Sequence, residues 1–199
     1  MDKYGTGDDP YCYPGTRVLR NRLNTRDEPV LIEAEYKLSQ IAASEVEFQL
    51  PPYSLAYLQN LHRHLFKDIY DWAGTLRSID ISKGDTRFCT ASRIEPEANK
   101  IFDSMTRANW FENLDKTDLV IALAEHFGDL NMIHPFREGN GRAQRILFEH
   151  IIANAGYETN WWAVEEAEWI KSNIDAVLCD YSGLASIFSR CVGATLILD

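Results

Sequence analysis

Basic residues are scarce in this chain of 199 amino acids. Its 20 Lys and Arg are outnumbered by 30 Asp and Glu, which gives a formal net charge of −10. Because an acidic protein repels nucleic-acid phosphates and anionic lipid surfaces, we expect neither nucleic acid nor a membrane as a partner. Any phosphate that the chain binds must be held by a local group of donors, which makes a local concentration of Arg informative.

Closely spaced cysteines and long apolar runs are also lacking. Cys12, Cys89, Cys179 and Cys191 lie far apart and form no CxxC pair, which excludes a zinc ribbon and argues against a disulfide framework. The N-terminus has neither the basic nor the apolar segment of a signal peptide, and no stretch has the apolar length of a transmembrane helix. We expect a cytoplasmic protein with reduced thiols.

What is present suits one globular domain over residues 1–199. Apolar residues make up 45% of the chain, enough for a real core. Residues 1–25, rich in Gly, Asp, Pro and Tyr, predict an irregular arm. Beyond it, apolar residues recur mostly at helical spacing. The helices expected from this pattern follow Asp27, begin near Ser54, begin near Pro96, run from Thr117 to Ile133, and cover 142–154, 161–174 and 182–192.

One segment, residues 76–90, has the composition of strands. Leu76, Ile79, Ile81 and Phe88 with flanking Ser and Thr suit two strands, and Lys83-Gly84-Asp85 is a turn signal between them. It is the only strand pair that the sequence indicates. The expected fold class is therefore all-α, a single helical domain that carries one β-hairpin.

The segment from His134 to Arg145, HPFREGNGRAQR, lies between two expected helices. Gly139 and Gly141 open directly into the second helix, where converging N–H groups and the helix dipole favour an anion. Arg142 and Arg145 share a helix face near this positive end, which disfavours each by roughly 0.3–1 kcal/mol. A bound anion explains both arginines, and a forked guanidinium suits phosphate oxygens.

Glu138 and His134 add reactive groups to this phosphate cradle. A carboxylate among phosphate donors calls for a hard cation, and Mg²⁺ takes one or two carboxylates together with substrate phosphates. His134, with an ordinary pKa of about 6.5, can accept a proton near neutral pH. Taken singly, a His before Pro is more often a cap or a core residue, and Gly-Asn-Gly is more often a turn. Together they indicate phosphate-ester chemistry with a nucleophile to be deprotonated.

The segment resembles the signature of the Fic family, HxFx(D/E)GN(G/K)RxxR, at every specified position. The resemblance extends to short bacterial Fic toxins over nearly the whole chain, and implies one Fic domain over 1–199. It also implies a protein adenylyltransferase, which moves AMP from ATP to a Tyr, Ser or Thr hydroxyl as pyrophosphate leaves. The further segments that carry it are Asp9-Pro10, Tyr13-Pro14-Gly15, RNRLN at 20–24, Trp72-Ala73-Gly74 and the hairpin.

The resemblance implies a role for each motif residue. His134 would be the general base, Glu138 would bind Mg²⁺, and Phe136 would anchor the loop in the core. Glycine rather than lysine at position 141 favours AMP transfer, because relatives with Lys there transfer the γ-phosphate instead. The residues expected to hold the phosphates of ATP are Gly139, Asn140, Gly141, Arg142 and Arg145.

The hairpin at 76–90 would be a flap that aligns the target by adding it as a strand. A plain decorative hairpin is the alternative. The flap residues expected to dock the target are Ile79, Asp80, Ile81, Thr86 and Phe88.

Two other functions of the whole protein also stay open. One is a phosphotransferase or other nucleotidyl transferase on the same fold, and the other is a non-catalytic nucleotide-binding interaction module.

Regulation is implied by something the chain lacks. Many Fic proteins carry a helix with the motif (S/T)xxxE(G/N), whose Glu pairs with the second motif Arg, and no match occurs here. We therefore expect a separate small helical antitoxin that supplies a Glu to Arg145. Related toxins modify DNA topoisomerase subunits, which makes such a subunit a possible target.

Histidines and tryptophans outside the motif have simpler interpretations. His62 and His64 are two apart on an expected helix, so they face different ways, and we expect them to be partly exposed rather than metal ligands. Trp161, Trp162 and Trp169 are expected in the core or at the edge of a nucleotide pocket.

Overall fold

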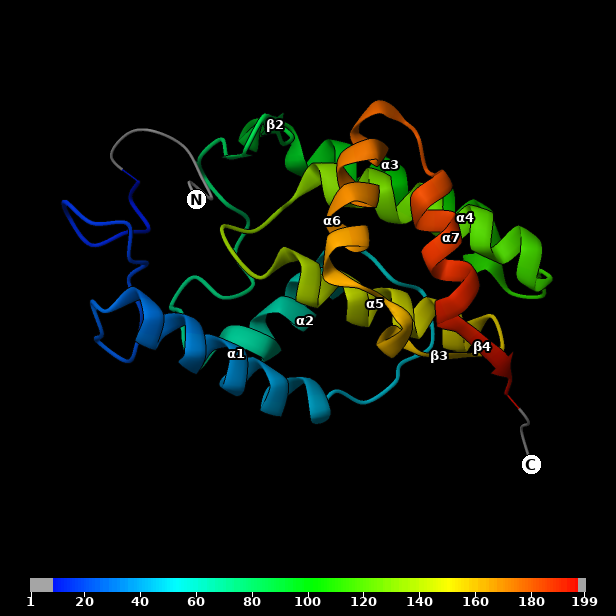
Figure 1. Cartoon of the computed structure of the whole chain (residues 1–199), viewed down its shortest axis with the longest axis horizontal. Helices are drawn as coiled ribbons and strands as arrows, with labels where there is room; N and C mark the ends of the chain where they lie inside the picture. Colours follow the sequence, from blue (N-terminus) through cyan, green and yellow to red (C-terminus); the bar gives the residue numbers. More distant parts are fainter. Residues whose placement is uncertain (1–8, 197–199) are drawn as a thin grey trace.

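The computed structural model describes residues 9–196. Helices dominate it, as Figure 1 shows, and a hydrophobic core runs through them. The α-helices are α1 (Glu28–Ser44), α2 (Leu55–Phe66), α3 (Ile94–Arg107), α4 (Lys116–Ile133), α5 (Asn140–Asn154), α6 (Glu166–Asp175) and α7 (Ser182–Cys191).

Side-chain caps explain where three of these helices begin. The carboxylate of Asp27 accepts the N–H of Val30, and the hydroxyl of Ser54 accepts that of Tyr57. Asp115 caps α4 in the same way. Each cap satisfies an N–H group that has no partner within its helix. The expected starts of α1 and α2 are thus confirmed.

The apolar spacing from Leu55 to Trp72 predicts a helix that continues until Gly74 closes it, and the structure corrects this end. The helix stops at Phe66, and the chain then turns as far as Gly74, whose φ is +79°. A Cβ at Gly74 would lie 2.8 Å from the carbonyl oxygen of Gln59, so glycine is required there. Ile69 is buried in these turns instead of continuing the helix, because tertiary packing rather than helical periodicity sets its place.

The central pair of helices is α4 and α5, joined by the motif loop. In Figure 1 they cross the middle of the molecule, with α1 and α2 along one edge and α6 and α7 in front. Contacts run from α1 to α2 to α5 on one side, and from α4 to α7 to α6 on the other. Edge-to-face ring contacts of Phe127 with Phe148 and Phe188, at centroid distances of 4.9 and 5.6 Å, tie the centre together.

In the part of the chain that the structure describes, two small antiparallel sheets accompany the helices. The expected hairpin forms, but its strands are short: β1 (Ser82–Lys83) pairs with β2 (Thr86–Arg87). A second sheet, β3 (Tyr157–Thr159) with β4 (Val192–Thr195), was not expected. It joins segments far apart in sequence, and the helix expected over 161–174 is a 3₁₀ turn at Trp161–Ala163 followed by α6.

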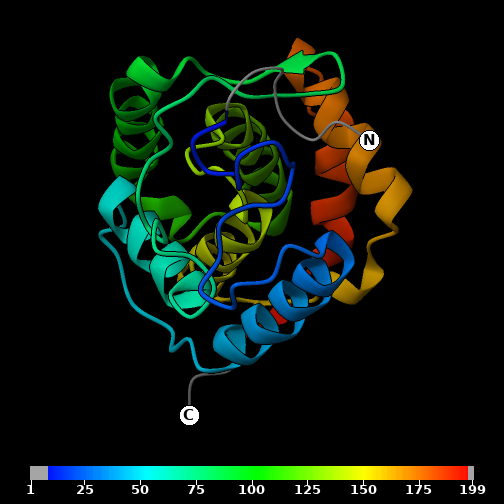
Figure 2. The same ribbon diagram turned by 90° about the vertical axis from the view of Figure 1, so that its left-hand side faces the viewer.

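The described part of the N-terminal arm packs on the body. Cys12 and Leu19 form a bridge within it, and the Tyr11 ring meets Trp72 edge-on at 5.5 Å. Figure 2 shows the arm (blue) crossing the end of the molecule near α4 and α5. Residues 1–8 of the expected arm lie outside the described residues. Within 9–196, no helix combines the length and apolarity that crossing a bilayer requires.

Candidate active site

The motif loop connects α4 to α5 through a constrained path. His134 has φ +46° and caps α4, and Gly139 has φ +80° immediately before α5. A Cβ at Gly139 would lie 2.4 Å from the Phe66 ring, so only glycine fits this approach. Asn140 locks the loop, because its side chain accepts the N–H of Phe136 and donates to the carbonyl of Phe136, both at 2.8 Å.

This path leaves the N-terminal end of α5, called the helix mouth below, accessible. The first N–H groups of a helix have no intrahelical partner and carry the positive end of its dipole. Gly141 is exposed in this first turn, and a Cβ there would meet nothing within 4 Å. Phe136 is fully buried, as the anchoring role requires. The loop therefore presents main-chain donors for an anion, while the side chain of Asn140 is occupied in shaping it.

His134 is held as a neutral base. Its Nδ1 lies 3.1 Å from the carbonyl of Asn131. A carbonyl can only accept, so Nδ1 carries the proton and Nε2 keeps a free lone pair. Burial lowers the pKa of His134 to about 4, so the ring is uncharged near neutral pH. The Phe88 ring stacks on it at 3.9 Å, which fixes its plane beneath the flap.

Glu138 is the single carboxylate of the loop. Its Oε1 accepts the N–H of Gly139 at 3.0 Å and lies 3.9 Å from Nη2 of Arg142. Among the described residues there is no group of three or more His, Cys, Asp or Glu that could hold a metal ion. One carboxylate fits Mg²⁺ only if phosphates and water complete the shell, which is how this ion is usually bound beside nucleotides.

The two motif arginines have different surroundings. Arg142 is engaged by α1: Nη2 donates to Glu35, Nη1 donates to Ser39 Oγ at 2.9 Å, and the guanidinium lies 4.6 Å over the Phe66 ring. Arg145 makes no hydrogen bond or salt bridge with any residue in 9–196. The two side chains therefore differ in their partners, although the charge of Arg142 still acts on Arg145.

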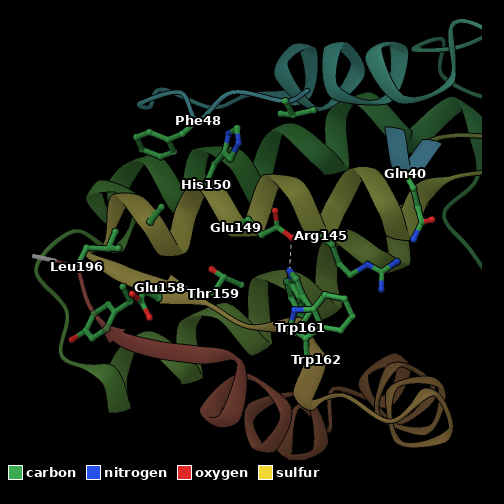
Figure 3. A pocket seen from close by; sticks show the side chains of 13 residues that line it. Gln40, Phe48, Arg145, Glu149, His150, Glu158, Thr159, Trp161, Trp162 and Leu196 are labelled. Carbon is green, nitrogen blue, oxygen red and sulfur yellow. Dashed lines mark hydrogen bonds between the residues drawn. The ribbon is translucent and has the colours of Figure 1, made fainter. Parts of the chain in front are cut away.

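Arg145 lines a cavity of about 910 Å³ between α1, α5 and β3. Figure 3 shows its guanidinium reaching into this space beside Trp161 and Trp162. Trp161 Nε1 donates to Glu149 Oε1 at 2.5 Å, and burial raises the pKa of Glu149. Trp162 is 97% exposed and lines this cavity, so of its two expected places the core is wrong. His134 is not part of this cavity lining.

His62 corrects another expectation, because it is fully buried rather than partly exposed. Nδ1 accepts the N–H of Gly74 and Nε2 donates to the carbonyl of Glu138, both at 2.8 Å. The ring also stacks on Phe136 at 3.8 Å. Position 62 falls on the apolar stripe of α2 with Leu58 and Leu65, and that periodicity was the signal available in the sequence.

Two further arginines support the loop from positions that the motif does not specify. Arg137 forms a buried ion pair with Asp9 of the arm, with Nη2 and Oδ2 2.6 Å apart. Arg77 is 2% exposed and donates to the carbonyl of His134 at 2.8 Å. No local pattern marks these residues, because their partners are remote in sequence.

The flap residues divide into two sets. Ile81 and Phe88 are buried against the body. Asp80 ties the two arms, since it accepts the N–H of Ala91 at 2.7 Å and pairs with Arg87 at 3.0 Å. Thr86 pairs with Lys83 at the tip. Docking of a target along the backbone of this hairpin stays a prediction.

Comparison with known proteins decides the family. The Fic/DOC family model matches residues 52–152, about half of the chain. This chain belongs to the Fic/DOC family. It is 40% identical over 191 residues to the probable protein adenylyltransferase Fic of Escherichia coli K12, covering 96% of each chain.

Two Bartonella proteins extend the comparison. The protein adenylyltransferase VbhT of Bartonella schoenbuchensis is 31% identical over 98% of this chain and 41% of its own length. The crystal structure of the effector BepC from Bartonella tribocorum, solved with bound AMPPNP, superposes with a TM-score of 0.86 at 23% identity, covering 93% of this chain and 97% of that one. The Fic resemblance, the mainly helical fold with a hairpin and the adenylyltransferase class are confirmed.

Proposed function

We propose that this protein transfers AMP from ATP to a Tyr, Ser or Thr hydroxyl of a target protein. The observation that carries the proposal is His134, a neutral base with a free Nε2, placed at the loop that opens into α5. A base beside a phosphate-binding helix mouth suits a reaction in which a hydroxyl attacks a phosphorus atom.

In this reaction Nε2 of His134 removes the proton as the target oxygen bonds to the α-phosphorus. The bond from that phosphorus to the bridging oxygen breaks, and pyrophosphate leaves. The N–H groups at the start of α5 and the side chains of Arg142 and Arg145 hold the phosphates and stabilise the charge that develops. Bound Mg²⁺ would neutralise phosphate charge, and Glu138 is the carboxylate that would hold it.

The flap would present the target. Its tip at Lys83-Gly84-Asp85 is exposed, and a target segment added along its edge would be held by main-chain hydrogen bonds. Phe88 reaches from the flap to the His134 ring. A strand docked here would thus lie close to the base.

The surroundings of Arg145 support a separate inhibitory protein. A partner's Glu entering the 910 Å³ cavity would meet a guanidinium that has no salt bridge within 9–196, with Trp161 and Trp162 beside it. We infer that a small helical antitoxin supplies this Glu. Replacing the Glu in a co-purified partner should restore ATP binding, whereas full AMP transfer in the presence of the intact partner would contradict the inference.

A topoisomerase subunit in the cytoplasm is a candidate target. Incubating purified subunits with labelled ATP tests it directly, and an unlabelled subunit removes that target while leaving the reaction open.

The proposed location is the cytoplasm. The four cysteines are free in the structure, which suits this reducing compartment, and the cytoplasm also supplies ATP.

The position of the label decides which group is transferred. A lysate or purified target is incubated with the protein, Mg²⁺ and ATP labelled at either the α- or the γ-phosphate. AMP transfer predicts that α-label alone becomes bound to protein and that His134→Ala abolishes the signal. Transfer of γ-label would show a phosphotransferase instead. Growth effects of His134→Ala that equal those of the unchanged protein would show a non-catalytic module.

A further inference from the structure

Arg77 is a buried arginine at the base of the flap, where the arms of the hairpin meet the end of α4. Its side chain is 2% exposed. It lies outside the signature motif: Arg77 comes five residues after Trp72 and precedes α4 in the chain, whereas the motif follows α4. Burying a guanidinium is costly unless its donors are satisfied, so its partners reveal what it holds.

Within residues 9–196, four backbone carbonyls accept hydrogen bonds from this side chain. Nη1 donates to Ile79 at 2.6 Å and Nη2 donates to Cys89, which are carbonyls of the two arms of the flap. Nε donates to His134 at 2.8 Å and Nη2 also donates to Ile133 at 3.2 Å. One rigid group thus joins both arms of the flap to the residue that carries the base.

The charge of Arg77 is also matched to this place. Ile133 and His134 supply the last carbonyls of α4, where the helix dipole is negative and a cation is favoured. A guanidinium keeps its charge in proteins and directs its donors in a fixed planar fork. Lysine could supply the charge and as many as three donors, but not the same geometry.

Backbone contacts make the junction continuous. The N–H of Arg77 donates to the carbonyl of Pro135, and the N–H of Cys89 donates to that of Met132, both at 2.9 Å. Between these bonds the Phe88 ring stacks on His134. Flap, base and motif loop therefore share one set of contacts with Arg77 at its centre.

We propose that Arg77 is a positioning residue that holds His134 and both arms of the flap in one geometry, so that a hydroxyl presented by the flap reaches Nε2. This proposal rests on the proposed AMP transfer. Arg77 itself does not touch the reacting atoms. A misplacement of about 1 Å at a reacting group can cost on the order of a hundredfold in rate, so the effect of loosening this junction should be kinetic as well as structural.

The test uses Arg77→Lys and Arg77→Gln, with Arg93→Lys as the matched control. Arg93 is an exposed arginine beyond the flap that pairs with Glu97. Three properties are measured on each full-length protein: hydrogen exchange of amides 78–90 against those of α5, the ¹⁵N shifts of the His134 ring, and the kinetics of AMP transfer to a target.

For Arg77→Lys we expect faster amide hydrogen exchange that is confined to the flap. We also expect ¹⁵N shifts which show that the His134 ring no longer has a single tautomer. The value of kcat/KM for the target should fall by about tenfold to a hundredfold, while KM for Mg·ATP stays within about twofold, since the α5 mouth is unchanged. Arg93→Lys should match the unchanged protein. Should Arg77→Gln not fold, Arg77→Lys alone carries the test.

Two results would overturn the proposal. One is an Arg77→Lys protein with unchanged flap exchange, ring shifts and target kinetics. The other is exchange that rises equally in the flap and in α5, with activity lost only in proportion to the folded fraction, which would make Arg77 a general stabiliser. If the unchanged protein transfers no AMP, the proposed function fails, but exchange and ring shifts still decide whether Arg77 positions the base.

Discussion

The motif loop and the flap meet at His134, yet they are built differently. Side chains from distant elements brace the loop: His62 from α2 binds the Glu138 carbonyl, Asp9 from the arm binds Arg137, and Phe136 is buried beneath it. The flap is fastened at its base by Arg77, and its paired strands are two residues long with an exposed tip.

The difference separates catalysis from recognition. Under the proposed function, the motif loop would keep His134 and the phosphate donors in place before substrate arrives, so that little reorganisation remains for the reaction. A hairpin with an exposed tip and strands of two residues belongs to the less stable part of a protein, and its tip can adapt as a target strand adds to it. Substitutions in the loop should therefore affect chemistry or folding, whereas those at the flap should affect target use.

Removing the base should have the largest effect. His134→Ala is expected to lower AMP transfer by about 10²–10⁴-fold, the usual contribution of a general base. Affinity for Mg·ATP should stay within about twofold, because the imidazole does not form the helix mouth. Radiolabelling and calorimetry measure the two effects. Transfer that persists at the original rate would remove His134 from the mechanism.

Closing the space at Gly139 should disrupt the loop next most strongly. Gly139→Ala places a Cβ 2.4 Å from Phe66 at φ +80°, and we expect a stability loss of about 1–3 kcal/mol with weaker ATP binding. Gly141→Ala is the matched control for stability, since its Cβ meets nothing within 4 Å. Equal unfolding midpoints in urea for the two variants would contradict the close approach.

Acid should weaken the braced loop. Burial lowers the pKa values of His62 and His134 to about 4. Between this value and the unfolded pKa of about 6.5, the unfolded chain binds a proton that the folded one does not. The free energy of unfolding should therefore decrease as the pH is lowered through this window, by about 1.4 kcal/mol per pH unit for each ring. Urea titrations at pH 7 and pH 5 that give equal stabilities would refute this.

Neutralising Glu35 should have a smaller effect and increase binding. Its carboxylate pairs with Arg142, so under the proposed function it would compete with phosphate for this side chain. Glu35→Gln keeps a hydrogen-bond acceptor but removes the negative charge, and we expect about three- to tenfold tighter Mg·ATP binding. Glu33→Gln is the control, because Glu33 lies on the same helix but pairs with Lys37 at the surface. Weaker binding in Glu35→Gln would show that Glu35 is needed to orient Arg142.

The mildest change is expected at the flap. Asp80→Asn weakens the links to Ala91 and Arg87, both near solvent. KM for the target should rise about two- to threefold, as expected for a partly exposed ion pair, with Mg·ATP affinity unchanged. A change in ATP binding would mean that flap and loop are less separate than the structure indicates.

Local signals carried the sequence predictions that succeeded. Caps at Asp27 and Ser54 and the apolar periodicity located helices, and the glycines of the motif marked the turn into α5. These features depend on neighbours within one or two helical turns. The motif residues are brought together for the same reason, since they lie on one short loop and the helix that follows.

What was missed depends on contacts between distant segments. The β3–β4 sheet joins residues near 158 and 193, and Arg142 finds Glu35 across 107 positions. The expectation that His62 is partly exposed ignored its place on the stripe of α2, where a polar ring is tolerated because both nitrogens are bonded. The different surroundings of Arg142 and Arg145 could not be deduced from their spacing.

The central claim is that a preformed helix mouth with two arginines grips the triphosphate of ATP beside a base. Calorimetric titration of ATP into the partner-free protein, with and without Mg²⁺, tests it most directly. We predict magnesium-dependent binding that His134→Ala retains and that an Arg142→Ala/Arg145→Ala protein loses. Absence of magnesium-dependent binding, or equal affinity in the double variant, would contradict it.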